Sequence, residues 1–154
     1  SIGFDGLLNF YAGRDEASDL KLEAAFKEHV GWNLKMGNPY VASANEELIN
    51  RIAGDDMVRG ITVACGGFFG PQGRQLRLPL MDPDLNQKIE SFKYDDLQVT
   101  NFEMESSALA GLSTLMGHKA MTCCMVIANR VAKKMETEYK GDIDGLITRV
   151  LDRI

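Results

Sequence analysis

The sequence predicts an α/β protein in which a mixed, mostly parallel sheet is flanked by helices in three layers. Strand-like and helix-like segments alternate along the 154 residues, which favours parallel strands joined by helical crossovers. The apolar segments 61–65 and 120–128 lack polar alternation, as is typical of interior strands covered on both faces. No repeat or linker divides the chain, so one domain is expected.

The chain opens with a turn at Asp5-Gly6, after which the apolar run 7–11 predicts a strand. Apolar residues between positions 22 and 30 recur at helical spacing and predict a helix that ends near Gly31. Residues 40–42 then predict a short strand.

Ser43 stands three residues before Glu46, which is the spacing of a capping box. This spacing predicts that Ser43 caps a helix whose buried face lies within 48–53. The β-branched run 61–65 predicts an interior strand, and a glycine-rich loop follows it.

The second half of the chain repeats this alternation. The expected elements are a helix at 84–92, a strand at 99–104, a helix at 108–116, an interior strand at 120–128 and an amphipathic helix at 143–154. In sheets of this kind, ligands bind at the loops beyond the carboxyl ends of the strands. That rule directs attention to 66–77, 101–106 and 129–130.

The composition excludes several partners and sites. A net charge of −5 provides no broad attraction for nucleic acid or an anionic membrane, and the longest apolar stretch is far shorter than the roughly 20 residues that cross a bilayer. The odd number of cysteines (Cys65, Cys123 and Cys124) in apolar segments favours a reducing cytoplasm. His29 and His118 have no Cys or acid at ligand spacing, so no metal site is expected.

The loop after the interior strand 61–65 mixes glycines with three side chains suited to a flat heterocycle. Phe68 offers an apolar ring face, and Gln72 and Arg74 offer an amide and a cationic fork two residues apart. The alternative is an ordinary glycine-rich surface turn with an exposed arginine.

Two carboxylates stand where the strand 99–104 passes into the next helix. In an extended segment Glu103 and Glu105 point to the same face and could together bind a vicinal diol. The alternative is that Glu105 is a helix N-terminal acid and Glu103 a solvated strand end.

These segments resemble motifs of the nucleoside phosphorylases, and within them of the uridine phosphorylases. Family members carry a Phe-(Tyr/Phe)-x-x-Gln-x-Arg loop, which residues 68–74 reproduce with Pro71 where many relatives have Gly. They also carry an Asn-(Tyr/Phe/Ile)-Glu-Met-Glu-Ser segment, matched by 101–106, and a Val-Ile-x-Asn-Arg stretch, matched by 126–130. Order and spacing agree, so the resemblance covers most of the chain.

The resemblance implies a phosphorylase-type α/β fold and cleavage of uridine by inorganic phosphate to uracil and ribose 1-phosphate, with no organic cofactor. It also implies a homo-oligomer, either a dimer or a trimer of dimers. The implied roles are stacking on the base by Phe68, bonding of its polar edge by Gln72 and Arg74, ribose binding by Glu103, Met104 and Glu105, and an apolar base pocket lined by Val126 and Ile127.

The residue chemistry suits that reaction. Cleavage leaves negative charge on the departing uracil, which Arg74 and Gln72 would stabilise more than the neutral ground state. The ribose becomes cationic, and a carboxylate such as Glu105 would orient the ring and favour that charge. These three are the expected catalytic residues.

Asn129 favours a pyrimidine substrate, because an amide cannot act as the general acid that purine-cleaving relatives use near this position. The alternative is that Asn129 and Arg130 merely end a strand. A nucleosidase that uses water and a nucleoside-binding fragment without turnover remain alternative functions.

The resemblance also bears on the extent of the domain. The phosphate-binding residues of the family lie in the amino-terminal half of its fold, ahead of the segment matched here. Residues 1–154 are therefore expected to be the carboxyl-terminal part of a single domain, with the phosphate site outside this chain.

Overall fold

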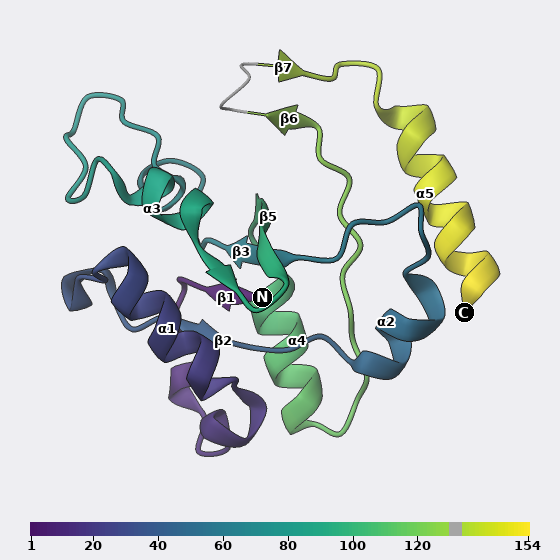
Figure 1. Ribbon diagram of the computed structural model, residues 1–154, viewed down its shortest axis with the longest axis horizontal. Helices are drawn as coiled ribbons and strands as arrows, with labels where there is room; N and C mark the ends of the chain where they lie inside the picture. The colour runs from purple at the N-terminus through teal and green to yellow at the C-terminus, as the bar shows by residue number, and fades with distance from the viewer. Residues whose placement is uncertain (130–133) are drawn as a thin grey trace.

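The computed structural model describes residues 1–129 and 134–154 and contains a five-stranded mixed sheet (Figure 1). In sheet order, its strands are β2 (Tyr40–Val41), β1 (Ile2–Gly3), β3 (Ile61–Ala64), β5 (Leu97–Glu103) and β4 (Lys93–Tyr94). The three central strands run parallel, and each edge strand is antiparallel to its neighbour. The expected mixed sheet is confirmed, with the parallel pairings at its centre and an antiparallel pairing at each edge.

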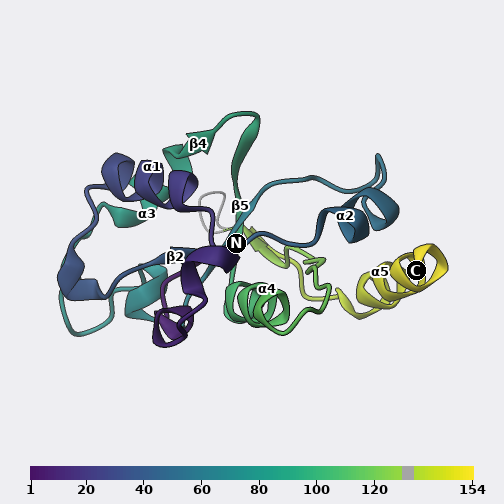
Figure 2. The same ribbon diagram turned by 90° about the horizontal axis from the view of Figure 1, so that it is seen from below.

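Helices cover both faces of this sheet, which gives the expected three layers. On one face, α1 (Leu20–Val30) packs against α3 (Leu85–Ser91). On the other face, α4 (Ser106–Leu115) packs with two 3₁₀ helices, η1 (Leu7–Phe10) and η2 (Arg14–Ala17). Figure 2 shows α1 and α3 on one side of the central strands and α4 on the other.

The remaining elements lie beside the sheet. The helices α2 (Glu46–Ile52) and α5 (Lys140–Arg153) contact each other, on the side of the molecule away from α1 in Figure 1. An antiparallel pair is formed by β6 (Ala128–Asn129) and β7 (Lys134–Met135). The short 3₁₀ helices are η3 (Leu34–Met36) and η4 (Gly70–Gln72). Each helix that the apolar periodicity predicts is present.

Aromatic rings form the centre of the core between α1, α3 and the sheet. Phe26 is fully buried, and its ring centroid lies 5.3 Å from that of Phe92, 5.9 Å from that of Phe4 and 6.0 Å from that of Trp32. These edge and tilted contacts are the geometries that aromatic pairs prefer. A second cluster beneath α4 contains Leu8.

Side-chain caps define the starts of two helices. Asp19 accepts hydrogen bonds from the backbone amides of Lys21 and Leu22 at the start of α1. Asn45 accepts one from the amide of Leu48 at 3.1 Å at the start of α2. The expectation that Ser43 caps α2 is therefore wrong, because Asn45 directly precedes the first helical turn and supplies the acceptor there.

Residues 7–11 do not form the expected strand, because local hydrogen bonds fold them into η1. The Asp5 carboxylate accepts from the amide of Leu7 at 2.8 Å, and the amide of Tyr11 donates to the carbonyl oxygen of Leu8 at 3.1 Å. Within this run only Leu8 is buried, while Phe10 is 88% exposed. Such side-chain bonds to nearby amides compete with sheet pairing.

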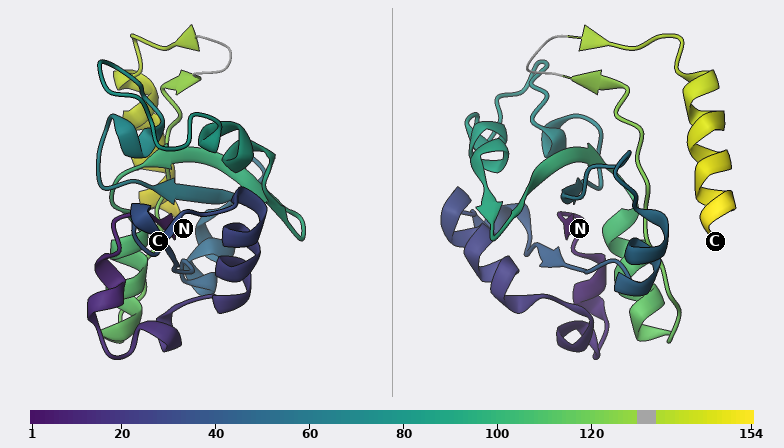
Figure 3. Two further views of the ribbon diagram at one scale, coloured as in Figure 1. Left: turned by 90° about the vertical axis from the view of Figure 1, so that its left-hand side faces the viewer. Right: turned by 45° about the vertical axis from the view of Figure 1, so that its right-hand side comes forward.

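Segment 120–128 does not form the expected interior strand. Apart from Ala128 in β6, it is assigned to no strand, and its side chains are half-buried or exposed. β3 is paired on both sides, with β1 and β5, and residues 120–127 are paired with no strand of this sheet in the described chain. The helix α5 forms as expected but buries none of its residues, and Figure 3 shows it at the outside of the molecule.

Candidate functional site

The three parallel strands end together, which brings the loops that follow them to one edge of the sheet. Gly3 of β1 is in register with Ala64 of β3, and Ala64 is in register with Glu103 of β5. Beyond the paired ends, the amide of Cys65 donates to the carbonyl oxygen of Glu103 at 2.9 Å. The two loops singled out in the sequence therefore begin side by side, where ligands bind in sheets of this kind.

The loop that follows β3 gathers the three side chains expected to bind a base. Arg74 Cζ lies 3.6 Å from the centroid of the Phe68 ring, within cation–π distance. Arg74 Nη1 donates to Gln72 Oε1 at 2.8 Å and also to the carbonyl oxygen of Phe68. The structure thus brings Phe68, Gln72 and Arg74 into one cluster.

The members of this cluster differ in their access to solvent. The Phe68 residue is 53% exposed, whereas Gln72 is only 4% exposed. The guanidinium of Arg74 covers one face of the Phe68 ring, and the rings of Phe68 and Phe69 are nearly perpendicular, with 5.4 Å between their centroids. A base that stacks on Phe68 must therefore use the other face or displace Arg74.

Backbone geometry and two residues outside the loop hold this cluster. Gly73 ends η4 with a φ of 69°, a left-handed conformation that glycine adopts without steric cost. Asn86 Nδ2 of α3 donates to the carbonyl oxygen of Gln72 at 3.1 Å, and Cys65 Sγ donates to that of Pro71 at 3.3 Å. Neither role could be predicted, because Asn86 lies in a helix distant in sequence and Cys65 ends an apolar strand.

The carboxylate of Glu103 holds the start of α4. Its Oε2 accepts hydrogen bonds from the amides of Glu105 and Ser106, both at 2.8 Å, and its Oε1 accepts one from Ser106 Oγ at 2.6 Å. It thus satisfies amides that a helix start leaves unpaired, next to the positive end of the helix dipole. Glu103 is the end of β5, as the alternative expected, but its carboxylate is hydrogen-bonded to the start of α4 and is not merely solvated.

Glu105 is the exposed carboxylate of this segment. It occupies the N-cap position of α4 but makes no side-chain cap bond. The expectation that Glu103 and Glu105 share a face assumed an extended backbone, whereas β5 ends at Glu103. Met104 between them is 37% exposed. The two carboxylates therefore have different surroundings, and of the two only that of Glu103 is hydrogen-bonded to the backbone of the turn.

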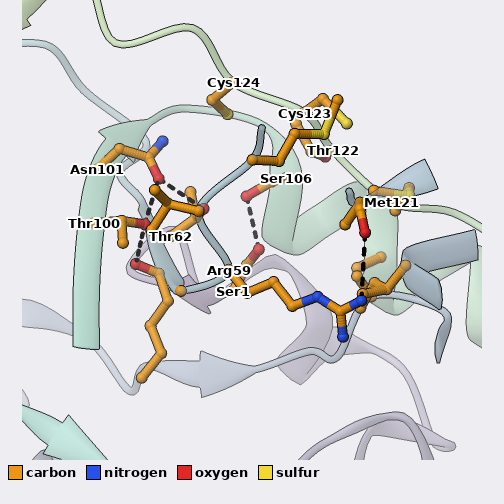
Figure 4. Close-up of a pocket in the computed structure, with 18 of the residues that line it drawn as sticks. Ser1, Arg59, Thr62, Thr100, Asn101, Ser106, Met121, Thr122, Cys123 and Cys124 are labelled. Atoms are coloured by element: carbon orange, nitrogen blue, oxygen red, sulfur yellow. Dashed lines mark hydrogen bonds between the residues drawn. The ribbon is translucent and has the colours of Figure 1, made fainter. Parts of the chain in front are cut away.

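Asn101 on β5 lies in a polar network that faces segment 120–126 (Figure 4). Its Oδ1 accepts hydrogen bonds from Thr62 Oγ1 at 2.9 Å and from Thr100 Oγ1 at 3.2 Å. Partial desolvation of the nearby Cys124 thiol raises its pKa, and a hydrogen bond with Asn101 opposes that rise. This thiol is therefore protonated at neutral pH.

A cavity of about 1140 Å³ opens beside this network (Figure 4). Val126 lines it together with Asn101 and Ser106, whereas Phe68 and Arg74 do not. Ile127 is 37% exposed and does not line the cavity either. Thus the residues expected to line the base pocket, Val126 and Ile127, do not share this cavity with the base loop.

The last motif of the resemblance lies on the β6–β7 pair. Asn129 is in register with Lys134 and is exposed. Arg130 lies outside the described residues.

Within the described ranges, no three His, Cys, Asp or Glu side chains gather into a group able to hold a metal ion. No helix there has the length and apolar character needed to cross a membrane.

Comparisons with known proteins agree with this architecture. The sequence model of the phosphorylase superfamily matches residues 5–151. A uridine phosphorylase of Thermococcus kodakarensis (strain ATCC BAA-918 / JCM 12380 / KOD1) is 40% identical over 81 residues, which cover 49% of this chain and 26% of that protein. The match thus spans about a quarter of the length of the curated relative. No solved structure matches the chain. Because the family match covers nearly all of its residues and its mixed sheet with flanking helices agrees with that fold, the chain belongs to the phosphorylase superfamily.

Proposed function

We propose that this protein is a nucleoside phosphorylase that cleaves uridine with inorganic phosphate. The observation that carries the proposal is the paired ending of β3 and β5, with the amide of Cys65 bonded to the carbonyl oxygen of Glu103 at 2.9 Å. The base-binding loop starts after β3, and the turn that carries the ribose-binding carboxylate starts after β5. Both therefore lie within reach of one nucleoside. The likeness of part of the chain to a uridine phosphorylase supports uridine as the substrate.

Arg74 and Gln72 are the proposed groups that stabilise the leaving base. As the glycosidic bond breaks, its electron pair goes to uracil, and N–H donors at the carbonyl edge bond this anion more strongly than the neutral base. Before a ligand arrives, the Arg74 guanidinium bonds to Gln72 Oε1 and covers the Phe68 ring. Binding then exchanges these internal contacts for contacts with the base.

Glu105 is the proposed partner of the ribose. Its exposed carboxylate accepts hydrogen bonds from the sugar hydroxyls and favours the positive charge that develops on the ring. Glu103 supports this role by holding the turn that carries Glu105, and Met104 adds an apolar contact. Phosphate attacks the anomeric carbon as the glycosidic bond breaks, so the exchange of bonds requires no organic cofactor.

A test of the reaction follows uracil release from uridine by ultraviolet absorbance, with and without inorganic phosphate. We expect release only when phosphate is present, in a protein that includes the amino-terminal segment in which the resemblance places the phosphate site. Equal release without phosphate would show that water is the nucleophile and that the protein is a nucleosidase. Inosine serves as a purine control, which we expect to be a poor substrate because Asn129 cannot protonate a departing purine.

A further inference from the structure

We propose that Asn86 is a positioning residue for base recognition, because it holds η4 so that the side chain of Gln72 faces the bound base. This inference rests on the proposed function, since it takes Gln72 as a base-binding group. Asn86 lies in the first turn of α3, outside every motif that the resemblance contains.

The first observation is the hydrogen bond between the two elements. Asn86 Nδ2 donates to the carbonyl oxygen of Gln72 at 3.1 Å. Gln72 is only 4% exposed, so its side chain is closely packed and moves with its backbone. Arg74 holds the other end of the same residue through Gln72 Oε1. Backbone and side chain of Gln72 are therefore fixed from two directions.

The second observation is the close packing of Asn86 against Gly73. A Cβ at position 73 would lie 2.2 Å from Asn86 Nδ2 and 2.5 Å from Asn86 Cγ, which is closer than real Cβ contacts. The space beside Gly73 is thus filled by the Asn86 carboxamide. Asn86 therefore contacts two successive residues of the base loop, one by a hydrogen bond and one by packing.

The third observation is that this placement is unfavourable for the helix itself. Asn86 Oδ1 is buried and has no hydrogen-bond partner in the part of the chain that the structure describes. A buried acceptor without a donor destabilises a protein, and an apolar residue at this position would avoid that loss. The hydrogen bond that Asn86 Nδ2 donates to the base loop therefore explains this side chain better than a contribution to the stability of α3.

Hydrogen–deuterium exchange tests the structural part of the inference in the full chain. The amides of Gln72, Gly73 and Arg74 donate to carbonyl oxygens within the loop at 3.0, 2.9 and 2.9 Å, so exchange reports how firmly η4 is held. We expect Asn86→Ala to speed exchange across 69–74 severalfold. The matched control is Gln87→Ala, an exposed neighbour on α3, which should leave exchange unchanged. Unchanged exchange in Asn86→Ala would overturn the inference.

Binding of uracil tests the functional part. Calorimetry gives the Kd of uracil for the wild type, Asn86→Ala, Gln72→Ala and the double variant. We expect about three- to tenfold weaker binding in Asn86→Ala, on the scale of one net hydrogen bond. No further weakening is expected when Gln72 is already alanine, because Asn86 acts through it.

Equal weakening by Asn86→Ala in both backgrounds would show a general effect on folding and overturn the positioning role. Absence of uracil binding by the wild type would overturn the proposed function and, with it, the role of Asn86 in base recognition. The exchange experiment would still decide whether Asn86 holds the turn. Failure of the inference and failure of the function are thereby distinguishable.

Discussion

At the scale of single residues, Arg74 is bound by its own loop before any base arrives, through the Phe68 ring and Gln72 Oε1. In the proposed reaction these contacts are exchanged for contacts between the guanidinium and uracil, so we expect the arginine to contribute most when the base carries charge. We predict that Arg74→Ala, in a protein that includes the phosphate site, lowers kcat for uridine by about 10²-fold or more, as for loss of one donor to a developing anion. Arg77→Ala, an exposed arginine in the same loop, is the control. Near-normal turnover by Arg74→Ala would remove Arg74 from the mechanism.

Removal of the Glu103 carboxylate and removal of the Glu105 carboxylate are expected to have different effects on the free energy of unfolding. Glu103 accepts two amide bonds at the start of α4, so Glu103→Ala should lower the free energy of unfolding by about 1 kcal/mol, as loss of a cap does. Glu105 makes no side-chain cap bond, so Glu105→Ala should leave stability within about 0.5 kcal/mol. Urea denaturation measures both values.

Ligand binding separates the two carboxylates further. Glu105→Ala should weaken the binding of uridine but not of uracil, because the proposed contact is with the ribose alone. Equal weakening of both ligands would place the role of Glu105 elsewhere than on the sugar.

Motifs predicted part of this site and could not predict the rest. Spacing of two residues was enough to group Gln72 with Arg74, since a tight turn brings such neighbours together. The role of Glu103 depends on where β5 ends, which the apolar pattern does not define to the residue. Asn86 meets Gln72 only because α3 folds back against the loop, and that contact has no local signal.

At the scale of elements, two arginines near the carboxyl end of α5 join this helix to the loop that follows α2. Arg149 and Arg153 both donate to the Asp56 carboxylate, at 3.2 and 3.1 Å, while no residue of α5 is buried. Exposed ion pairs are weak and screened by salt. We predict that Asp56→Ala or high salt speeds hydrogen exchange in α5, whereas the neighbouring Asp55→Ala does not. Slow exchange in Asp56→Ala would show that apolar contacts hold the helix.

The same contact predicts a pH dependence. Hydrogen bonding from Arg153, followed by that from Arg149, lowers the pKa of Asp56 below its ordinary value. A carboxylate with a lowered pKa stabilises the fold above its ordinary pKa and loses this effect as the pH falls through the lower value. Exchange in α5 should therefore be unchanged between pH 8 and pH 5 after correction for intrinsic rates, and should rise below about pH 4. A rise already near pH 6 would implicate another group.

Helices were easier to predict than strands because a helix satisfies its own backbone. The apolar spacing in 22–30 and 108–116 was enough to predict α1 and α4. A strand needs a neighbour, and the apolar run 120–128 carries no information on whether one is present. Residues 7–11 show the reverse case, in which Asp5 and Gly6 favour a local turn over pairing.

At the scale of the whole molecule, the strand that leads into the candidate site is also part of the hydrophobic core. Ile61 and Val63 of β3 belong to the same buried cluster as Phe26 and Phe92, and β3 leads directly into the base loop. The loop after β3 and the turn after β5 thus depend on a sheet that is held in place by α1 and α3. Loss of core packing on the α1 face should therefore disturb both.

Phe26→Ala tests this dependence, because Phe26 is fully buried and contacts rings from three other segments. Removing a buried ring leaves a cavity in addition to the lost transfer energy, so the free energy of unfolding should fall by about 3–5 kcal/mol. Leu34→Ala, at a residue 71% exposed, should change it by less than about 0.5 kcal/mol. Urea unfolding followed by Trp32 fluorescence and by uridine binding should give coincident midpoints that shift together in Phe26→Ala. Separate midpoints would mean that the site loops unfold independently of the core, because a single cooperative unit loses all its probes at once.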